Sequence, residues 1–271
     1  MESQTTFQPG TLRFRCNVCG QKCLINGEEL QRELASCPVC NSSPRTRAIV
    51  RTLSVELFGE NLALADFPAK KELRGLGMTD SEAYAKQLAE KFTYENTYLH
   101  QEPYLDISAT EVASERLESS DFIISSEIFE HVVPPVQRAF QNTFKMLKPG
   151  GILVLTVPYG TQAETVEHFP ELYDFTIIAD NGSYRLKNVT RSGEVQEFRD
   201  LIFHGGPGST LEMRVFAEAA LLHHLAEAGF EAITVHRTPD LPHGVWWPEP
   251  WSFPFSARRP RSNVSGLKAN A

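Results

Sequence analysis

The chain has 271 residues, 41% of them hydrophobic, and a formal net charge of −8 at pH 7. This length and composition are typical of one sizeable α/β domain with a small additional module. The acidic balance argues against a general nucleic-acid binder, because such a protein needs a basic face to neutralise phosphates. No apolar run approaches the ~20 residues of a membrane helix, and the first residues have no apolar core of a secretory signal. We therefore expect a cytoplasmic protein with neither a membrane nor nucleic acid as partner.

The cysteines predict a metal module over residues 1–42. Four of the five form two Cys-x-x-Cys pairs, Cys16 with Cys19 and Cys37 with Cys40. Thiolates at this spacing can converge on one tetrahedral Zn²⁺, and four of them close its coordination shell. The sequence therefore predicts a structural zinc ribbon. Disulfides, which are disfavoured in the cytoplasm, and plain buried thiols are the alternatives. The fifth thiol, Cys23, is expected to pack, to stay free or to replace Cys19.

A connector is predicted over residues 43–70. Ser43 is a candidate N-cap, Pro44 suits the first helical position, and Gly59 is a candidate C-cap. The helix between them carries an apolar stripe that would tie the ribbon to the main domain. The helix also carries three arginines, Arg45, Arg47 and Arg51. They could bind an acidic acceptor or could form a solvated face of the helix.

Residues 121–158 read as strand, loop, helix, turn and strand. The apolar runs 122–124 and 152–155 are typical of strands buried on both faces. Between them, apolar residues recur at helical spacing, with Pro134 and Pro135 in the predicted first turn and Pro149-Gly150-Gly151 as the stop. Two buried strands joined through a helix make a parallel βαβ unit, whose ligands bind beyond the carboxyl ends of the strands.

These residues resemble a known family. The segments D-F-I-I-S-S-E-x-x-E-H-V and L-K-P-G-G-x-L-V-L-T-V-P are similar to the later motifs of class I S-adenosylmethionine-dependent methyltransferases. The resemblance implies a Rossmann-like, doubly wound, mostly parallel sheet over residues 71–259, preceded by the four-cysteine zinc ribbon. It also implies S-adenosylmethionine as cofactor, with Ser126 and Glu127 lining its site.

A first strand and its glycine turn are predicted over residues 70–78, followed by a helix over 81–92. In the family such a turn cradles the methionine part of the cofactor, which assigns Gly75 and Gly77 to cofactor binding. The chain departs from the family pattern, with Leu73 in place of its acid and Thr79 in place of its third glycine. Asp80 could supply the missing carboxylate or could simply cap the helix.

The remaining cofactor contacts follow from the resemblance. Family members often end the second strand, here predicted at residues 96–99, with an acid that binds the ribose, and Glu102 is the nearest acid. Asp106 resembles the acid that accepts a hydrogen bond from the adenine amino group, with Ile107 against the ring. Asp106 as the cap of a turn is the alternative.

Residues 160–208 are long for a βα connection and predict an acceptor-side insertion. A hairpin is expected within it, with strands at 184–190 and 195–203. His168 and His204 lie on its predicted loops, and His131 follows the 122–124 strand. We take His131 and His204 as the candidate bases for an acceptor hydroxyl, because imidazole exchanges protons near neutral pH. A loop histidine that only bonds the backbone is the alternative.

The last third of the chain completes the expected sheet. A helix is predicted over residues 216–228 and strands over 232–236 and 253–257, the final strand inserted antiparallel as in the family. Trp246, Trp247 and Trp251 lie between those strands and could form an acceptor wall or a core lid. Residues 260–271 are expected to be a flexible tail.

Taken together, the sequence predicts an S-adenosylmethionine-dependent methyltransferase that methylates an oxygen of a small molecule, a sugar or another metabolite. Two other interpretations stay open. One is a non-catalytic zinc-ribbon adaptor on a degenerate methyltransferase scaffold, which the irregular glycine turn favours. The other is an RNA methyltransferase whose ribbon docks on the nucleic acid. The acceptor, the methylated atom and the oligomeric state do not follow from the sequence.

Overall fold

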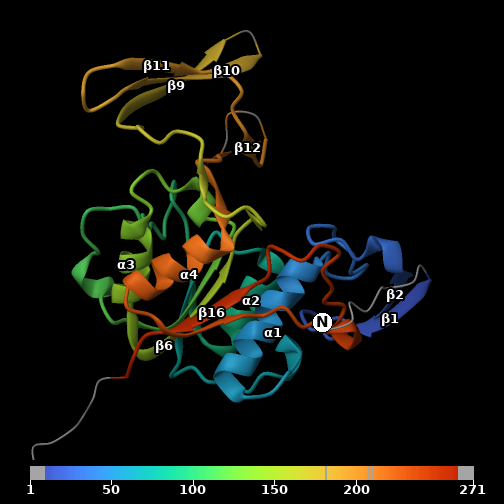
Figure 1. The fold of residues 1–271 in the computed structure, drawn as a ribbon. Helices are drawn as coiled ribbons and strands as arrows, with labels where there is room; N and C mark the ends of the chain where they lie inside the picture. Colours follow the sequence, from blue (N-terminus) through green and yellow to red (C-terminus); the bar gives the residue numbers. More distant parts are fainter. Residues whose placement is uncertain (1–9, 181, 207, 209, 262–271) are drawn as a thin grey trace, which may run out of the picture.

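The computed structural model describes residues 10–180, 182–206, 208 and 210–261 (Figure 1). The predicted tail lies outside the described residues except for Pro260 and Arg261. Within the described part of the chain, no helix combines the length and the apolar character needed to cross a membrane.

A six-stranded sheet forms the centre of the molecule, in the order β15-β16-β6-β5-β3-β4. Strands β4, β3, β5 and β6 run parallel, and β16 is antiparallel to both of its neighbours, β6 and β15. This confirms the predicted mostly parallel sheet with an inserted antiparallel strand. The strands are β3 (Arg74–Met78), β4 (Thr93–Thr97), β5 (Ser120–Ser126), β6 (Leu147–Thr156), β15 (Glu231–Val235) and β16 (Phe255–Arg258).

Helices cover both faces of this sheet, as a doubly wound fold requires. Side chains alternate along a strand, so Phe122 and Ile124 pack with α1 (Pro44–Phe58) and α2 (Glu82–Lys91), whereas Ile123 faces α3 (Gln137–Met146) and α4 (Glu218–Glu227). The two apolar layers are separate clusters of buried residues, one on each face. The strands between them are buried on both faces, which explains their continuous apolar sequence.

The ends of the helices agree with the capping signals in one case and differ in another. Helix α1 begins after Ser43, whose Oγ accepts from the Thr46 N–H, and ends at Gly59 with a φ of +70°, as predicted. Helix α3 begins only at Gln137, so Pro134 and Pro135 precede it instead of forming its first turn. The predicted stop at residues 149–151 belongs to strand β6, because the chain becomes extended directly after Met146.

The ribbon is a hairpin of β1 (Thr11–Arg15) and β2 (Lys22–Asn26) followed by the 3₁₀ turn η1 (Gly27–Glu29), and it packs against α1 within one shared apolar cluster. The solvated interpretation of the connector arginines is wrong for Arg47, which is 0% exposed. Its guanidinium donates to the carbonyls of Ser42 and Gly244 and to Oγ of Ser36. Arg47 therefore joins the ribbon to the C-terminal part of the chain.

The insertion after β6 forms a separate three-stranded sheet in the order β11-β10-β9. The predicted hairpin is present as β10 paired with a shorter β11, and the preceding strand β9 was not predicted. In Figure 1 this sheet stands away from the central sheet, beyond α4. The strands of the insertion are β7 (Tyr159–Gly160), β8 (Val166–Glu167), β9 (Asp174–Asp180), β10 (Ser183–Val189), β11 (Val195–Phe198), β12 (Phe203–His204), β13 (Thr210–Leu211) and β14 (Arg214–Ala217).

Two other predicted elements have shifted boundaries. Strand β4 spans Thr93–Thr97, earlier in the chain than the predicted 96–99, and Tyr98 instead forms an isolated bridge with Tyr104. Residues 98–119 then reach β5 with only the 3₁₀ turn η3 (Ser114–Arg116). Helix α4 begins at Glu218, because Phe216 pairs with Tyr159 in strand β14. Two further 3₁₀ turns are η2 (Leu64–Asp66) and η5 (Leu241–His243).

Candidate functional site

The carboxyl ends of the parallel strands meet at one edge of the sheet. Strand β3 ends at Met78, paired with Ser125 of β5, and Ser126 is paired with Thr156 of β6. The hydroxyls of Ser126 and Thr156 lie 2.9 Å apart, within hydrogen-bond distance. The predicted site residues Asp80, Ser126 and Glu127 all lie at this edge, which is where parallel α/β sheets bind their ligands.

The two predicted glycines lie inside strand β3, and the turn follows them. A Cβ on Gly75 would lie 2.1 Å from the Phe122 ring, and one on Gly77 would lie 2.0 Å from Oη of Tyr94. Glycine is therefore required at both positions because protein side chains pack directly on the backbone. Thr79 has a φ of +56°, the left-handed conformation that glycine favours, at the position where the family has its third glycine.

Asp80 follows the glycine strand and is buried. Its Oδ1 accepts a hydrogen bond of 2.6 Å from the Tyr84 hydroxyl, and its Oδ2 accepts one from the Tyr94 hydroxyl. Burial raises the pKa of Asp80 to about 7, although both tyrosine hydrogen bonds favour the charged form. A carboxylate has about four lone-pair positions, so it can still accept from a ligand's ammonium group.

We expect Asp80 to make the protein less stable as the pH rises. In the folded state Asp80 keeps its proton up to about pH 7, whereas an unfolded aspartate releases it near pH 4. The free energy of unfolding therefore falls as the pH rises from about 4 to about 7, and Asp80 causes no further loss above that range. Between pH 5 and pH 8, wild type should lose about 3 kcal/mol relative to Asp80→Asn. Urea unfolding at both pH values measures this difference. Glu82→Gln, which removes an exposed carboxyl from the first turn of α2, should behave as wild type. A pH profile of Asp80→Asn that runs parallel to that of wild type would contradict the assignment.

Two arginines from the ribbon side reach the same edge. Arg32 donates from Nη2 to Oε1 of Glu127 at 2.9 Å, and Arg45 donates to the Ser126 hydroxyl. Burial opposes the charge on Glu127, but the charge of Arg32 and its hydrogen bond outweigh that effect and lower the pKa of Glu127. The segment that follows η1 therefore forms part of the wall at this edge.

The other predicted cofactor residues lie on the loop after β4. Asp106 accepts through Oδ1 from both the N–H and the hydroxyl of Ser108, so it does cap a turn. Both hydrogen bonds use Oδ1, so Oδ2 of Asp106 could still accept a hydrogen bond from a ligand. Ile107 is buried in the main cluster, and Glu102 is exposed with Oε2 accepting from the Tyr104 N–H. The cofactor roles of these residues stay predictions.

The 3₁₀ turn η4 (Phe129–His131) follows the edge and carries one of the predicted bases. Burial lowers the pKa of His131, which favours its neutral form. Glu130 beside it is 0% exposed, and neither carboxyl oxygen has a hydrogen-bond partner within the described residues. Burial and then the negative charge of Glu127 raise the pKa of Glu130 well above its ordinary value.

The insertion brings the second predicted base to the first. The rings of His131 and His204 are in edge-to-face contact, with centroids 4.8 Å apart, although the residues are far apart in the sequence. His131 Nδ1 lies 2.9 Å from the carbonyl oxygen of Leu211. Glu212 contacts Nε2 of His168 at 2.8 Å and Nε2 of His204 at 3.0 Å. All three histidines that the sequence singled out therefore meet in one cluster.

Arg214 in β14 fixes this arrangement. The side chain is 0% exposed and donates from Nη1 to the carbonyls of Phe129 and Val132, at either end of η4. Its Nε donates to Glu167 of β8 at 2.7 Å. The Met213 N–H donates to the Glu130 carbonyl on the same side. Strand β14 thus holds the turn that carries His131.

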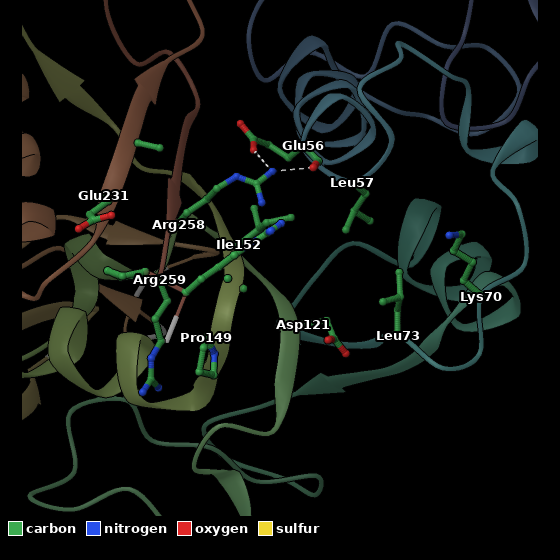
Figure 2. Close-up of a pocket in the computed structure, with 15 residues that line it drawn as sticks. Glu56, Leu57, Lys70, Leu73, Asp121, Pro149, Ile152, Glu231, Arg258 and Arg259 are labelled. Carbon is green, nitrogen blue, oxygen red and sulfur yellow. Dashed lines mark hydrogen bonds and ion pairs between the residues drawn. The ribbon is translucent and has the colours of Figure 1, made fainter. Parts of the chain in front are cut away.

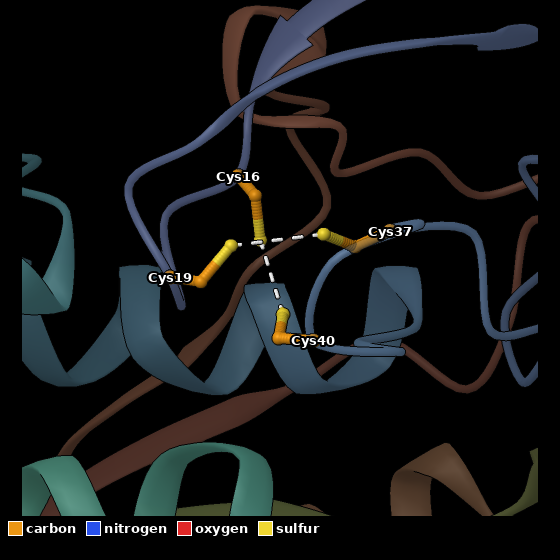
Figure 3. A group of neighbouring side chains, drawn as sticks. All are labelled: Cys16, Cys19, Cys37 and Cys40. Atoms are coloured by element: carbon orange, nitrogen blue, oxygen red, sulfur yellow. Dashed lines mark hydrogen bonds between the residues drawn. The ribbon is translucent and has the colours of Figure 1, made fainter.

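The four ribbon cysteines converge on one point (Figure 3). The sulfurs of Cys16 and Cys40 lie 3.7 Å apart, and so do those of Cys19 and Cys37. A tetrahedron of thiolates at the usual Zn–S distance of about 2.3 Å has edges of about 3.8 Å, whereas a disulfide bond is near 2.05 Å. The donor set and its spacing therefore fit a tetrahedral Zn²⁺.

A cavity of about 660 Å³ lies at the opposite edge of the sheet, at the amino ends of β3 and β5 (Figure 2). Leu73, Asp121, Glu231 and Arg258 are among the residues that line it, and Arg258 is paired with Glu56. None of the predicted site residues borders this cavity. We therefore place the candidate site at the carboxyl edge, where the polar side chains gather.

Sequence reasoning placed Glu130 at the ligand-binding edge without giving it a role, and it missed Arg32 and Glu212 as site residues. The adjacent Glu130-His131 pair after a buried strand was a usable signal, because two titratable residues follow the strand at the edge where ligands bind. No local pattern marks Arg32 or Glu212. Both reach the site through pairings that are distant in the sequence.

Trp247 is mostly buried against Phe253, which favours the core interpretation for this tryptophan. Trp246 and Trp251 are partly buried and pack against the two main clusters. The tryptophans therefore do not form an open aromatic wall.

Residues 60–155 match the family model described as "Methyltransferase domain". The match begins at the end of α1 and includes the glycine strand, the edge residues 126–131 and most of β6. The chain carries a methyltransferase domain, and the resemblance to class I S-adenosylmethionine-dependent methyltransferases is confirmed for this part. The sequence interpretation as an enzyme is confirmed with it.

No curated protein matches the chain in sequence. Among solved structures, the chain is similar to an S-adenosylmethionine-dependent methyltransferase from Clostridium acetobutylicum, at 12% identity and a TM-score of 0.40, covering 78% of this chain and 97% of that one. It is also similar to the amino pentose methyltransferase CalS10 from Micromonospora echinaspora (15%, TM-score 0.37, 69% and 83%) and to the sugar N-methyltransferase KedS8 from Streptoalloteichus (13%, TM-score 0.41, 70% and 81%). These similarities are too distant to carry an argument about substrate.

Proposed function

We propose that the protein transfers a methyl group from S-adenosylmethionine to an oxygen atom of a small molecule. The observation that carries the proposal is the methyltransferase domain whose carboxyl edge gathers Asp80, Ser126 and Glu127 beside the histidine cluster. The acidic net charge fits a small acceptor better than a nucleic acid. The predicted cytoplasmic location stays a prediction.

For this reaction the protein's main task is to align the acceptor oxygen with the methyl group of the cofactor. The acceptor oxygen attacks the sulfonium methyl carbon in line, the C–O bond forms, and the C–S bond breaks with its electron pair going to sulfur. The sulfur leaves as a neutral thioether, so positioning the two reactants is the main source of rate. The hydroxyl proton must also leave, and we assign the activation of the hydroxyl to His131 and His204.

For the cofactor we propose the edge residues. Asp80 would accept from the ammonium group, Ser126 and Glu127 would line the site, and Gly75 and Gly77 would lie beneath it. In the structure Tyr94 and Asp80 cover Gly77, so the ligand would contact the turn at residues 79–81 instead of the glycine faces themselves. Glu102, Asp106 and Ile107 would hold the ribose and adenine. The cluster of four ribbon cysteines would hold a structural Zn²⁺.

Calorimetric titration of S-adenosylmethionine, and separately of its demethylated product, tests this function. We expect micromolar binding of both to the wild-type protein. Asp106→Ala should weaken both by about tenfold or more, because a buried ligand amino group would lose its acceptor. Glu111→Ala, an exposed carboxyl on the same loop, is the matched control and should bind as wild type.

The opposite outcome is equally informative. If neither compound binds to the folded protein, the residues at this edge do not hold the cofactor in the proposed way. Tyr94 and Asp80 over Gly77 are the specific observation that favours this outcome. If both compounds bind but Asp106→Ala leaves their affinities unchanged, the adenine assignment alone is wrong.

A further inference from the structure

Three potential metal ligands meet at the mouth of the histidine cluster. One donor atom from each of Glu130, His131 and His204 lies within 4.8 Å of the other two. Their exposure rises from the interior outward, with the side chains 0%, 12% and 40% exposed in that order. The group therefore has a buried carboxylate at its base and an imidazole that solvent can reach.

The hydrogen bonds of His131 determine which nitrogen faces the cluster. A carbonyl oxygen only accepts, so the contact between Nδ1 and the Leu211 carbonyl places the ring proton on Nδ1. The lone pair is then on Nε2, and Nε2 lies 3.5 Å from Oε1 of Glu130. A histidine whose other nitrogen donates to a backbone carbonyl is the usual arrangement of a metal ligand, because this bond fixes the tautomer and the ring.

Glu130 gives an independent indication of a ligand. Its carboxyl group is fully buried, and neither oxygen has a hydrogen-bond partner among the residues that the structure describes. A buried carboxyl group without a hydrogen-bond partner is unfavourable, and a bound cation would compensate its charged form. Arg32 and Arg45, the nearby cations at the edge, donate to the carboxylates of Glu127 and Glu33, to the Ser126 hydroxyl and to the Ser252 carbonyl, and not to Glu130.

Glu212 orients His204, the third of these potential ligands, without belonging to the group itself. Its carboxylate contacts Nε2 of His204 and Nε2 of His168, so it determines how the His204 ring is oriented. Carboxylates that hold a ligating histidine in this way are common around protein-bound metals. Glu212 is thus a positioning residue in this arrangement and not itself one of the three ligands.

We propose that Glu130, His131 and His204 bind one divalent transition-metal ion, separate from the ribbon's cysteine cluster. Two imidazoles and one carboxylate suit ions such as Mn²⁺, Co²⁺ or Zn²⁺ better than Mg²⁺, which prefers oxygen alone. Ligands at bonds of about 2.1 Å lie at most about 4.2 Å apart, so small side-chain rotations close the group around an ion. Three protein ligands leave coordination positions open.

The ion would activate the acceptor for methyl transfer. This part of the inference rests on the proposed function. An acceptor hydroxyl that binds the ion becomes more acidic, as metal-bound water does. Its proton passes to solvent water on the exposed side of His204, and the resulting alkoxide or phenolate attacks the methyl carbon. The open positions favour acceptors with two adjacent oxygen atoms, which can chelate the ion and hold the reacting oxygen in line.

Titration of the zinc-loaded protein with Mn²⁺ alone and with Co²⁺ alone tests the site without cofactor or acceptor. Manganese prefers oxygen and nitrogen over thiolates, so it leaves the cysteine cluster undisturbed. We expect one ion per chain, by electron paramagnetic resonance for Mn²⁺ and by calorimetry for Co²⁺. Glu130→Gln and His204→Ala should each weaken binding at least tenfold, and Glu212→Gln should weaken it about tenfold.

His223→Ala is the matched control, because His223 is an exposed histidine on α4 whose ion pair is with Glu227 of the same helix. It should bind the ion as wild type does. His204→Ala removes a largely exposed side chain and is expected to stay folded, so it keeps the test valid if Glu130→Gln unfolds. The proposal is overturned if neither ion binds at one per chain, or if binding is unchanged in His204→Ala. Binding of S-adenosylmethionine in the same samples reports on the proposed function separately.

Discussion

Cys37→Ser is expected to release the Zn²⁺ that we propose for the ribbon and to lower the melting temperature by about 10 °C or more. The ribbon contributes to the apolar cluster over α1, and metal binding is coupled to the folding of such small modules. A loss of about 3–5 kcal/mol corresponds to a shift of this size in a chain of this length. Calorimetric melting and metal analysis, with one zinc per chain in wild type, measure both effects.

Cys23→Ser is the matched control for this prediction. Its sulfur lies 3.6 Å from that of Cys37, yet it is not one of the four converging thiols. The variant should keep its zinc and most of its stability. If Cys23→Ser also loses the metal, the fifth thiol is a ligand. A fully folded, zinc-free wild-type protein would overturn the ribbon itself.

Losing the zinc should also weaken cofactor binding. Arg32 and Arg45 reach Glu127 and Ser126 from the segment that surrounds the second cysteine pair. Without the metal this segment loses its anchor, and Glu127 loses the cation that favours its charge. S-adenosylmethionine should then bind less tightly to a zinc-depleted sample at a temperature where the central sheet is still folded.

Arg214→Met is expected to destabilise the protein by about 3–5 kcal/mol, because it leaves buried polar groups without their partner. Two carbonyls at η4 and one oxygen of Glu167 would lose their donor. Urea unfolding monitored by circular dichroism measures the change. Arg199→Met, an exposed arginine on the insertion, should change the free energy of unfolding by no more than about 0.5 kcal/mol.

The same variant should separate the two predicted bases. Without Arg214, strand β14 no longer fixes η4, and the contact between the His131 and His204 rings is expected to loosen. The line widths and chemical shifts of the two imidazoles in NMR spectra report on this. Equal unfolding free energies for Arg214→Met and Arg199→Met would show that the buried arginine does not hold the insertion.

Much of the fold could be predicted because its signals are local. Strands β5 and β6 are continuous apolar runs, and α1 has a serine cap at one end and a glycine at the other. The cysteine pairs were predictive for the same reason, since each pair lies on one turn of the chain. The predictions that failed depended on pairing between distant segments, such as the extended chain at residues 149–151 and the buried guanidinium of Arg47.

The sequence alone predicted the class of protein, through its resemblance to a known family, and it also predicted the grouping of the four cysteines and the edge at which a ligand would bind. The last two predictions follow from side-chain periodicity and from the spacing of a few residues, which act over one or two turns of chain. Only the tertiary structure decided that His131 and His204 form one cluster, that Glu130 is buried beneath them with no hydrogen-bond partner among the described residues, and that Arg32 reaches Glu127. These contacts join segments separated by up to about a hundred residues, and their geometry depends on how the ribbon and the insertion pack on the sheet.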